Sequence, residues 1–404
     1  MSTTIVKTKI LFLSTYPPKK CGIASFTNDL INAINREFPD DTATDVCALD
    51  KKLNRELYEN KVSSLMDSFQ LDSCLETAHK INNDPLIKLL CIEHEFGLYG
   101  GELGEYLLGF LSLIEKPFIV RFHTVIPSPS LKMLKVVQSI ALLADKLVVM
   151  TQNSATVLKE DYNVSAGKLI IIPHGTHNYS TINANQLKSK YNLNNRKVLT
   201  TFGLLSPNKG IEKGILAMKE ISKALPDSIY LVIGQTHPNL IQNEGESYRD
   251  YLKQLIIENG LQNNVRLINE YVPTHNLMEY LALTDVYLFT SKDPNQAVSG
   301  TFLYAMGSGC PVISNSFVLA KEMLDETTGV VLKTDRPEEL AENAICILQN
   351  HELQQQMSAN ARSKTRNTTW EKVGKKHVQL FSSILAMNLS PTGELPKYDT
   401  QNSL

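Results

Sequence analysis

Two stretches in the second half of the chain carry groups that could bind a diphosphate. In the first, Thr201–Gly210, a predicted strand runs into a predicted helix, with Lys209 at the helix start. Its ammonium group would add to the positive end of the helix dipole, an arrangement that suits an anion. An ordinary solvated lysine is the alternative. The position directly after a strand favours the binding role.

The second stretch lies just before another predicted helix. Asn295 and Gln296 carry amides that could hydrogen-bond the hydroxyls of a sugar. Ser299, Gly300 and Thr301 would place backbone N–H groups and hydroxyls at a helix N-terminus, which favours anions. Helix capping alone would also explain Ser299, so both interpretations stay open there.

In the first half, polar groups follow three predicted strands. Glu93, His94 and Glu95 come at a strand end, followed by closely spaced glycines. In an extended chain His94 would point away from the two glutamates, so at least one of the three is structural. Gly22 precedes a helix, and either its N–H faces a ligand or it only permits a tight turn. His123 could bond a sugar hydroxyl, although such a histidine is more often structural.

The elements that must position these residues alternate regularly along the chain. Twelve apolar runs predict strands: Ile10–Ser14, Thr44–Ala48, Ile87–Glu93, Phe118–Phe122, Leu147–Thr151, Leu169–Pro173, Val198–Gly203, Ile229–Gly234, Val265–Asn269, Val286–Thr290, Pro311–Ser314 and Gly329–Leu332. Helical patterns lie between them, for example Ala24–Arg36, Leu131–Leu143, Lys209–Leu225, Glu246–Glu258 and Pro337–Leu348. Near-continuous apolar strands indicate parallel sheets that are covered on both faces. Ligands of such sheets bind beyond the carboxyl ends of the strands.

The length of 404 residues exceeds what one hydrophobic core usually serves. We predict an α/β protein with two Rossmann-like, doubly wound parallel-sheet domains. The first would occupy residues 1–177 and the second 178–369, with the linker near the start of the polar stretch Thr176–Arg196. Residues 389–404 are expected to form a poorly ordered tail.

The composition is that of an ordinary globular protein. Forty Lys and Arg nearly balance 42 Asp and Glu, so no nucleic acid is expected as a partner. The apolar runs are too short for a membrane span, and the N-terminus lacks the features of a signal peptide. We therefore expect a cytoplasmic protein, with peripheral contact at the inner face of a membrane left open. Six scattered cysteines predict neither disulfides nor a zinc site.

Taken in order from Ile10 to about Leu385, these stretches resemble the group-1 (family 4) retaining glycosyltransferases, which have the GT-B fold. The segments that carry the resemblance are Thr15–Phe26, Glu93–Gly101, Arg121–Pro127, Ile172–Gly175, Gly203–Gly210 and Asp293–Gly309. Asn295-Gln296 followed by Ser299-Gly300-Thr301 is similar to a bacterial subgroup of that family.

The resemblance implies an enzyme that transfers a hexose from a nucleotide-sugar donor to a hydroxyl of a saccharide or lipid-linked saccharide, with retention. The second domain would hold the donor and the first the acceptor, and a helix at 370–388 would return to the first domain. No cofactor and no metal is expected, because Lys209 and helix termini would replace a cation. No Asp-x-Asp motif occurs.

The resemblance also assigns roles to individual residues. Catalytic roles would fall to His123, Lys209 and Gln296. Donor contacts would come from Gly22, Gly203, Arg249, Tyr271, Val272, Asn295, Ser299, Gly300, Thr301 and Tyr304. Acceptor contacts would come from Lys20, Glu93, Glu95 and Tyr99.

The chain departs from the family pattern in two places. Family members usually carry two glutamates eight positions apart, and Gln296 and Tyr304 occupy those positions here. An amide is a weaker acceptor than a carboxylate, and Tyr304 cannot accept two ribose hydroxyls. An arginine usual before the Lys209 turn is also missing; Arg249 is a candidate substitute, with a surface salt bridge as the alternative.

These departures leave a second function open. A non-catalytic sugar-nucleotide-binding or scaffold subunit, derived from a glycosyltransferase, would keep the fold without turnover. A dinucleotide-dependent oxidoreductase is disfavoured because no G-x-G-x-x-G follows any predicted strand.

Overall fold

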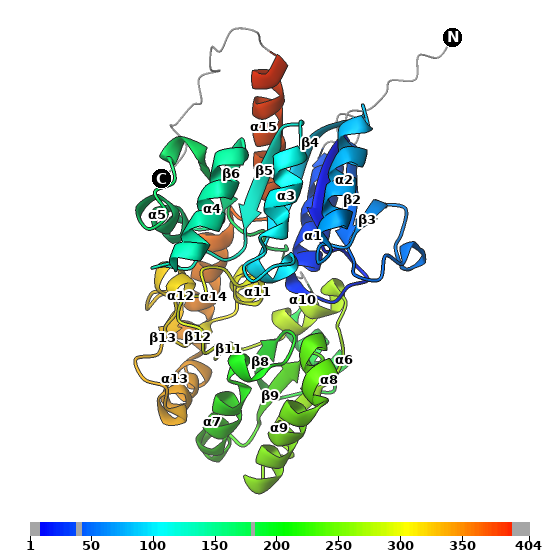
Figure 1. Cartoon of the computed structure of the whole chain (residues 1–404). Helices are drawn as coiled ribbons and strands as arrows, with labels where there is room; N and C mark the ends of the chain where they lie inside the picture. The colour runs from blue at the N-terminus through cyan, green and yellow to red at the C-terminus, as the bar shows by residue number, and fades with distance from the viewer. Residues whose placement is uncertain (1–8, 38–42, 179–181, 390–404) are drawn as a thin grey trace, which may run out of the picture. The chain divides into compact units, whose positions relative to one another are not determined.

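The structure is a computed structural model that describes residues 9–37, 43–178 and 182–389 (Figure 1). It forms two compact units. One comprises the chain up to Pro173 together with the segment that begins at Trp370, and the other comprises His174–Thr369. The predicted tail at 389–404 lies outside the described residues, except for Leu389, which ends the last helix.

The first unit is built on seven parallel strands in the order β3-β2-β1-β4-β5-β6-β7. Their bounds are β1 Lys9–Ser14, β2 Ala43–Leu49, β3 Val62–Met66, β4 Ile87–His94, β5 Phe118–Phe122, β6 Lys146–Val149 and β7 Leu169–Ile171. The direction of winding reverses between β1 and β4. The loops after these two strands therefore flank the position where doubly wound sheets bind ligands.

Helices cover both faces of this sheet (Figure 1). They are α1 Gly22–Glu37, α2 Leu71–Asn83, α3 Tyr106–Leu113, α4 Leu131–Leu143, α5 Gln152–Glu160 and α15 Trp370–Leu389. α2, α3 and α4 share one core with alternate strand residues such as Leu11 and Val120. On the other face, Phe12 meets Phe381 of α15 edge to face at 6.3 Å. α15 packs beside α1, and a Cβ at Gly374 would lie only 3.2 Å from Ala33.

The second unit has six parallel strands in the order β10-β9-β8-β11-β12-β13. The strands are β8 Lys197–Phe202, β9 Ser228–Ile233, β10 Val265–Ile268, β11 Val286–Phe289, β12 Val312–Ser314 and β13 Gly329–Val331. The helices are α6 Ala184–Lys190, α7 Ile211–Ala224, α8 Pro238–Glu244, α9 Ser247–Glu258, α10 Thr274–Ala282, α11 Gly300–Ser308, α12 Val318–Met323, α13 Pro337–Gln349 and α14 His351–Thr365. Its winding reverses between β8 and β11.

Two apolar cores lie on opposite faces of this second sheet. The successive β8 residues Val198 and Leu199 belong to different cores, as do Leu231 and Val232 of β9. Both faces are therefore covered, which explains why the strand sequences are apolar throughout rather than alternating.

The predicted fold class is confirmed, and all twelve predicted strands are present. β3 was not predicted: it lies at the sheet edge and is only half apolar, Val62-Ser-Ser-Leu-Met66. The predicted helix start at Lys209 was wrong by two residues. Lys209 ends a short 3-10 turn, Pro207–Lys209, and α7 begins after Gly210, whose φ is +60°.

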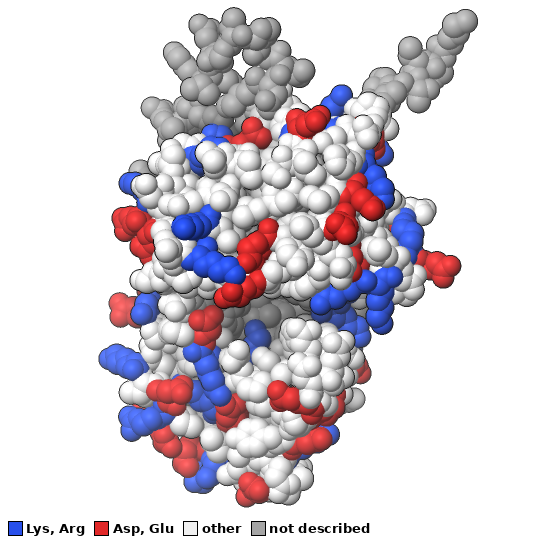
Figure 2. Space-filling view, viewed as in Figure 1, with Lys and Arg blue, Asp and Glu red and all other residues white. Residues whose placement is uncertain are grey.

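Charged side chains of both signs are interspersed on the face of each unit shown in Figure 2. This distribution matches the near balance of acidic and basic residues in the composition. Among the described helices, none combines the length and the apolar character that crossing a bilayer demands.

Candidate functional site

In the second unit, the ends of β8 and β9 meet at two glycines. Gly203 and Gly234 have φ of +132° and +147°, and a Cβ on Gly234 would lie 1.9 Å from the Gly203 carbonyl oxygen. Only glycine allows such a close backbone approach. A Cβ on Gly203 would meet the Thr301 side chain at 3.3 Å. Gly203 therefore lies beside the start of α11, and the structure brings these two predicted donor residues together.

The N-terminus of α11 is capped, yet it keeps unused donors. The Ser299 hydroxyl accepts from the Phe302 N–H at 3.5 Å and lies 3.2 Å from the Thr301 hydroxyl. In the described part of the chain, nothing accepts a hydrogen bond from the N–H groups of Gly300 and Thr301. Capping accounts for Ser299, while the neighbouring N–H groups remain available to an anion at the positive end of the helix.

Gln296 is held within its own loop. Its side-chain oxygen accepts from the Ser291 hydroxyl at 3.2 Å, and its amide donates to the Val298 carbonyl at 3.0 Å. One N–H and one lone pair of the amide remain for a ligand. Asn295 is exposed, and its backbone N–H bonds Asp293 at 3.0 Å.

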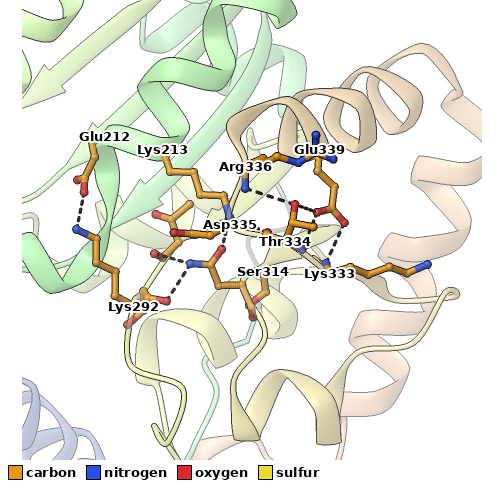
Figure 3. Close-up of polar contacts among 12 residues, drawn as sticks. Glu212, Lys213, Lys292, Ser314, Lys333, Thr334, Asp335, Arg336 and Glu339 are labelled. Carbon is orange, nitrogen blue, oxygen red and sulfur yellow. Dashed lines mark hydrogen bonds and ion pairs between the residues drawn. The ribbon is translucent and has the colours of Figure 1, made fainter.

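A buried lysine supports the backbone before this loop (Figure 3). Lys213 of α7 donates to Asn315 Oδ1 at 2.6 Å, to Asp335 Oδ1 at 2.9 Å and to the Thr334 carbonyl at 3.3 Å. Asn315 in turn donates to the carbonyls of residues 290 and 291 at 2.9 and 3.1 Å. Lys213 is thus fully engaged in fixing the end of β11.

Lys209, four residues earlier, differs from Lys213 in having no acceptor. Its backbone is fixed, because the Thr290 hydroxyl donates to the Lys209 carbonyl at 2.8 Å. Among the described residues, no side chain or carbonyl accepts from its ammonium group. Burial lowers the pKa of Lys209, and burial together with Lys209 lowers the pKa of the nearby His237. An ammonium group that is partly withdrawn from water and has no counter-charge among the described residues is a ready site for an anion.

Arg249 lies inside the unit, so the alternative of a surface salt bridge does not hold. Its side chain is 2% exposed. Nη2 donates to the Gly234 carbonyl at 2.6 Å, and Nε lies 3.3 Å from both Thr236 Oγ1 and Glu246 Oε2. Nη1 is buried and has no partner in the described part of the chain. Arg249 therefore braces the Gly203–Gly234 contact and keeps one nitrogen, Nη1, without a partner among the described residues.

The remaining predicted donor residues lie on α11 and after β10. Tyr304 stands between two histidines, with ring centroids 5.7 Å from His174 and 4.6 Å from His177. Tyr271 is 41% exposed, and Val272 packs against an apolar core of the unit. Tyr304 thus lies in an aromatic cluster with the two histidines.

In the first unit, a buried ion pair lies under α15. The parallel register places Glu93 opposite Arg121, both are completely buried, and Arg121 Nη1 bonds Glu93 Oε1. Glu93 Oε2 accepts from His123 Nε2 at 2.7 Å, and Arg121 Nη2 bonds His377 Nε2 of α15. Burial alone would raise the pKa of Glu93, but Arg121 and His123 outweigh it and lower the pKa.

This arrangement corrects part of the predicted acceptor site. Glu93 has both oxygens engaged in the interior, and Tyr99 is 1% exposed with its hydroxyl donating to the Glu93 carbonyl at 2.8 Å. Neither side chain is available to an acceptor. Glu95 is only partly buried, where it caps a short turn and bonds Thr124, and Lys20 is exposed. Gly22 begins α1, with open space where a Cβ would lie.

His94 is the structural member of its triplet. It ends β4, is fully buried, and neither ring nitrogen has a partner among the described residues. The rings of Phe96, Tyr99 and Phe122 surround it, with centroids 5.1, 6.4 and 4.6 Å away. Burial lowers the pKa of His94 to about 3, with a smaller contribution from His123. The ring is therefore neutral near pH 7.

We expect the first unit to lose stability as the pH falls below neutrality. With a folded pKa of about 3 against 6.5 for a free histidine, the unfolded chain takes up the proton first. Stability therefore decreases as the pH falls from about 6.5 towards 3. At pH 5, His94 lowers the free energy of unfolding by about 2 kcal/mol. Urea unfolding followed by the fluorescence of Trp370, the single tryptophan, measures this at pH 7 and 5.

Two variants isolate the His94 contribution. His377 adds to the total, since burial lowers its pKa as well, so the comparison is between variants. His94→Leu should weaken the pH dependence by about 2 kcal/mol, whereas His79→Gln, at an exposed position of α2, should leave it intact. An unchanged pH dependence in His94→Leu would contradict the assignment.

Two residues of the first unit were not predicted from the sequence. Arg121 is a charged residue within an otherwise apolar strand, and this is the signal that could have marked it as half of a buried pair. His377 lies four residues from Val373 and from Phe381, on the apolar stripe of α15. Its helical spacing places it inward, but its partner is 256 residues away in sequence.

Two doubly wound parallel-sheet units in one chain are the architecture of the GT-B fold. Anabaena HepE, solved with UDP and glucose, superposes with a TM-score of 0.73 and 17% identity over 93% of this chain and 100% of that one. Sucrose-phosphate synthase from Thermosynechococcus elongatus superposes with a TM-score of 0.76 and 17% identity, over 94% of this chain and 100% of that chain. At this level of identity the likeness concerns the fold.

Sequence comparison finds partial matches to known proteins. Residues 183–364 match the family model of glycosyl transferases group 1. The glycosyltransferase MJ1069 of Methanocaldococcus jannaschii is 24% identical over 202 residues, 49% of this chain and 48% of that protein. A GDP-mannose-dependent phosphatidylinositol monomannoside mannosyltransferase of Mycolicibacterium smegmatis is 24% identical over 153 residues, 36% and 37% of the two chains. The chain thus spans about half or less of these relatives, and the family match lies within the second unit.

Proposed function

We propose that the protein is a retaining glycosyltransferase that moves a hexose from a nucleotide-sugar donor to a hydroxyl acceptor without a metal ion. The observation that carries the proposal is Lys209, whose ammonium group has no acceptor among the described residues although burial lowers its pKa. It lies where the winding of the second sheet reverses, the position where such sheets bind ligands.

The diphosphate of the donor would be held by three kinds of donor group in this unit. Lys209 supplies a charge, Gly300 and Thr301 supply backbone N–H groups at a helix start, and Arg249 has an unpaired Nη1. A charge-assisted hydrogen bond of this kind contributes about 1.5–3 kcal/mol. In this proposal these groups supply the positive charge that a divalent cation supplies elsewhere.

Retention would follow from assistance by the leaving group. The bond from the anomeric carbon to the phosphate oxygen breaks, the acceptor oxygen bonds to that carbon on the same face, and its proton passes to the departing phosphate. Such a step needs no carboxylate base. The amide of Gln296, which stands where the family has a glutamate, is suited to hydrogen-bonding the sugar but not to removing a proton.

The acceptor is proposed to be a saccharide or a lipid-linked saccharide bound by the first unit. Glu95 and Lys20 remain candidates for acceptor contacts because both reach the surface. The name of the mycobacterial relative specifies a glycolipid acceptor for that enzyme. Saccharide classes and linkage are tested by transfer assays once a donor is known.

One observation favours a second candidate function. Both positions of the usual glutamate pair carry uncharged residues, Gln296 and Tyr304. A subunit that binds a sugar nucleotide without turning it over would need the diphosphate groups but not that pair. Nucleotide binding without donor hydrolysis or transfer would favour this alternative.

The proposal is tested first by nucleotide binding. UDP, GDP and ADP, each with EDTA, should be compared by thermal unfolding of the full chain. At a concentration 100 times its dissociation constant, the preferred nucleotide raises the free energy of unfolding by about 2.7 kcal/mol. The midpoint of thermal unfolding then rises by a few degrees. Stabilisation by none of the three, or only after magnesium is added, would count against the proposal.

A further inference from the structure

His123 stands at one end of an unbroken chain of buried hydrogen bonds. The chain runs from the Val373 carbonyl of α15 through His377, Arg121 and Glu93 to His123. His377, Arg121 and Glu93 have almost no exposed surface, whereas the His123 side chain is 12% exposed. Only the last member can therefore meet a ligand.

The donor and acceptor roles along this chain are fixed from its buried end. His377 Nδ1 lies 2.7 Å from the Val373 carbonyl, which can only accept, so Nδ1 carries the hydrogen and Nε2 accepts from Arg121. A guanidinium group only donates, so Glu93 accepts from Arg121. The ionised carboxylate also accepts at its second oxygen, and His123 Nε2 must carry a hydrogen.

We infer that Glu93 is a positioning residue that favours the Nε2–H tautomer of the neutral His123 ring, and that this tautomer presents Nδ1 as a hydrogen-bond acceptor. Nδ1 has no partner within the described residues, so it is the ring nitrogen left for a ligand. Under the proposed function, on which this part rests, the group that it accepts from is a hydroxyl of a sugar substrate. The site then favours a hydroxyl over a fluorine, since fluorine cannot donate.

A single isosteric variant should reverse the tautomer. In Glu93→Gln, the amide oxygen must face Arg121, which only donates, and the amide NH₂ group then faces His123. His123 Nε2 must accept, so the neutral ring carries its hydrogen on Nδ1. The exposed edge of the ring changes from acceptor to donor without a change in side-chain volume.

The tautomer is read directly by NMR of the full chain with ¹⁵N-labelled histidine. Ring-nitrogen shifts separate protonated from unprotonated nitrogens, and the signal lost in His123→Gln assigns His123 among the nine histidines. At a pH where the spectra show a neutral ring, we expect Nε2–H in the wild type and a change of tautomer ratio of about tenfold or more in Glu93→Gln. Glu95→Gln, whose carboxylate bonds Thr124 instead, should leave the signal unchanged.

The NMR measurement requires no turnover, so its result does not depend on whether the proposed function is correct. An Nδ1–H wild-type ring would overturn the inference even if Glu93→Gln failed to fold, as would an Nε2–H ring in the folded variant. The substrate part is tested with monofluorinated sugar substrates. At the sugar position where fluorine slows the wild type most, the ratio of kcat/KM for the hydroxyl sugar to kcat/KM for the fluorinated sugar is measured in both proteins. This ratio should fall about tenfold in Glu93→Gln. Equal ratios in the two proteins would refute the contact with the sugar.

Discussion

Glycosyl transfer by the Lys209→Ala variant is expected to be about 100- to 1,000-fold slower than by the wild type, with the fold intact. The ammonium group would neutralise charge that develops on the departing diphosphate, and the neighbouring Lys213 does not take that role, because it is committed to Asn315 and Asp335. The measurement is the turnover number with the donor identified by the nucleotide screen. Thermal unfolding of the variant verifies the fold.

Lys223→Ala provides the matched control. Lys223 lies in the last turn of α7 and forms an exposed pair with Glu220 at 2.8 Å. Removing it deletes one lysine from the helix that follows the Lys209 turn and should leave turnover at the wild-type level. Wild-type rates in Lys209→Ala would contradict the proposed role, whereas equal losses in both variants would indicate a general effect of charge.

Arg121→Met should destabilise the first unit by about 3–5 kcal/mol, because it leaves the Glu93 carboxylate buried without a counter-charge. The total free energy of unfolding of a native domain is about 5–15 kcal/mol, so the variant would lose much of its stability. Urea unfolding monitored through Trp370 measures the change. Trp370 belongs to this unit, and its ring centroid lies 5.2 Å from that of Phe26.

Two comparisons separate the buried charge from the loss of a side chain. Lys132→Met removes a cation that is 46% exposed and pairs with Glu105 at 2.7 Å, and it should cost under about 1 kcal/mol. The double variant Glu93→Gln, Arg121→Met carries no unpaired charge and should be more stable than Arg121→Met alone. Strictly additive effects would show that the two side chains do not act as a pair.

The parallel sheets and the strand-end positions of the donor residues could be predicted because they depend on local patterns. Apolar runs that alternate with helical periods determine the sheets, and Gly203 and Thr301 then fall at strand or helix ends. Lys209 could be located in the same way. What the sequence could not show is that this lysine lacks an acceptor while Lys213 has three.

The acceptor side was harder to predict because its side chains depend on distant partners. Glu93 at a strand end looks like a ligand-binding carboxylate until the register places it opposite Arg121. Arg249 looks like a surface residue within a helical charge pattern until burial is known. In both cases the contact that decides the role joins segments that are separate in the sequence, and their separation along the chain does not predict how close they lie in space.

The packing of α15 against the first sheet has a consequence for biosynthesis. Arg121 cannot meet His377 until 256 further residues have been translated, which at about 5–20 residues per second takes roughly 13–50 s. During that interval the sheet face that carries Phe12 lacks its last helix, while the whole of His174–Thr369 is being translated. The first unit is therefore begun first in translation and is the last to be completed, because its final helix follows the whole of the second unit.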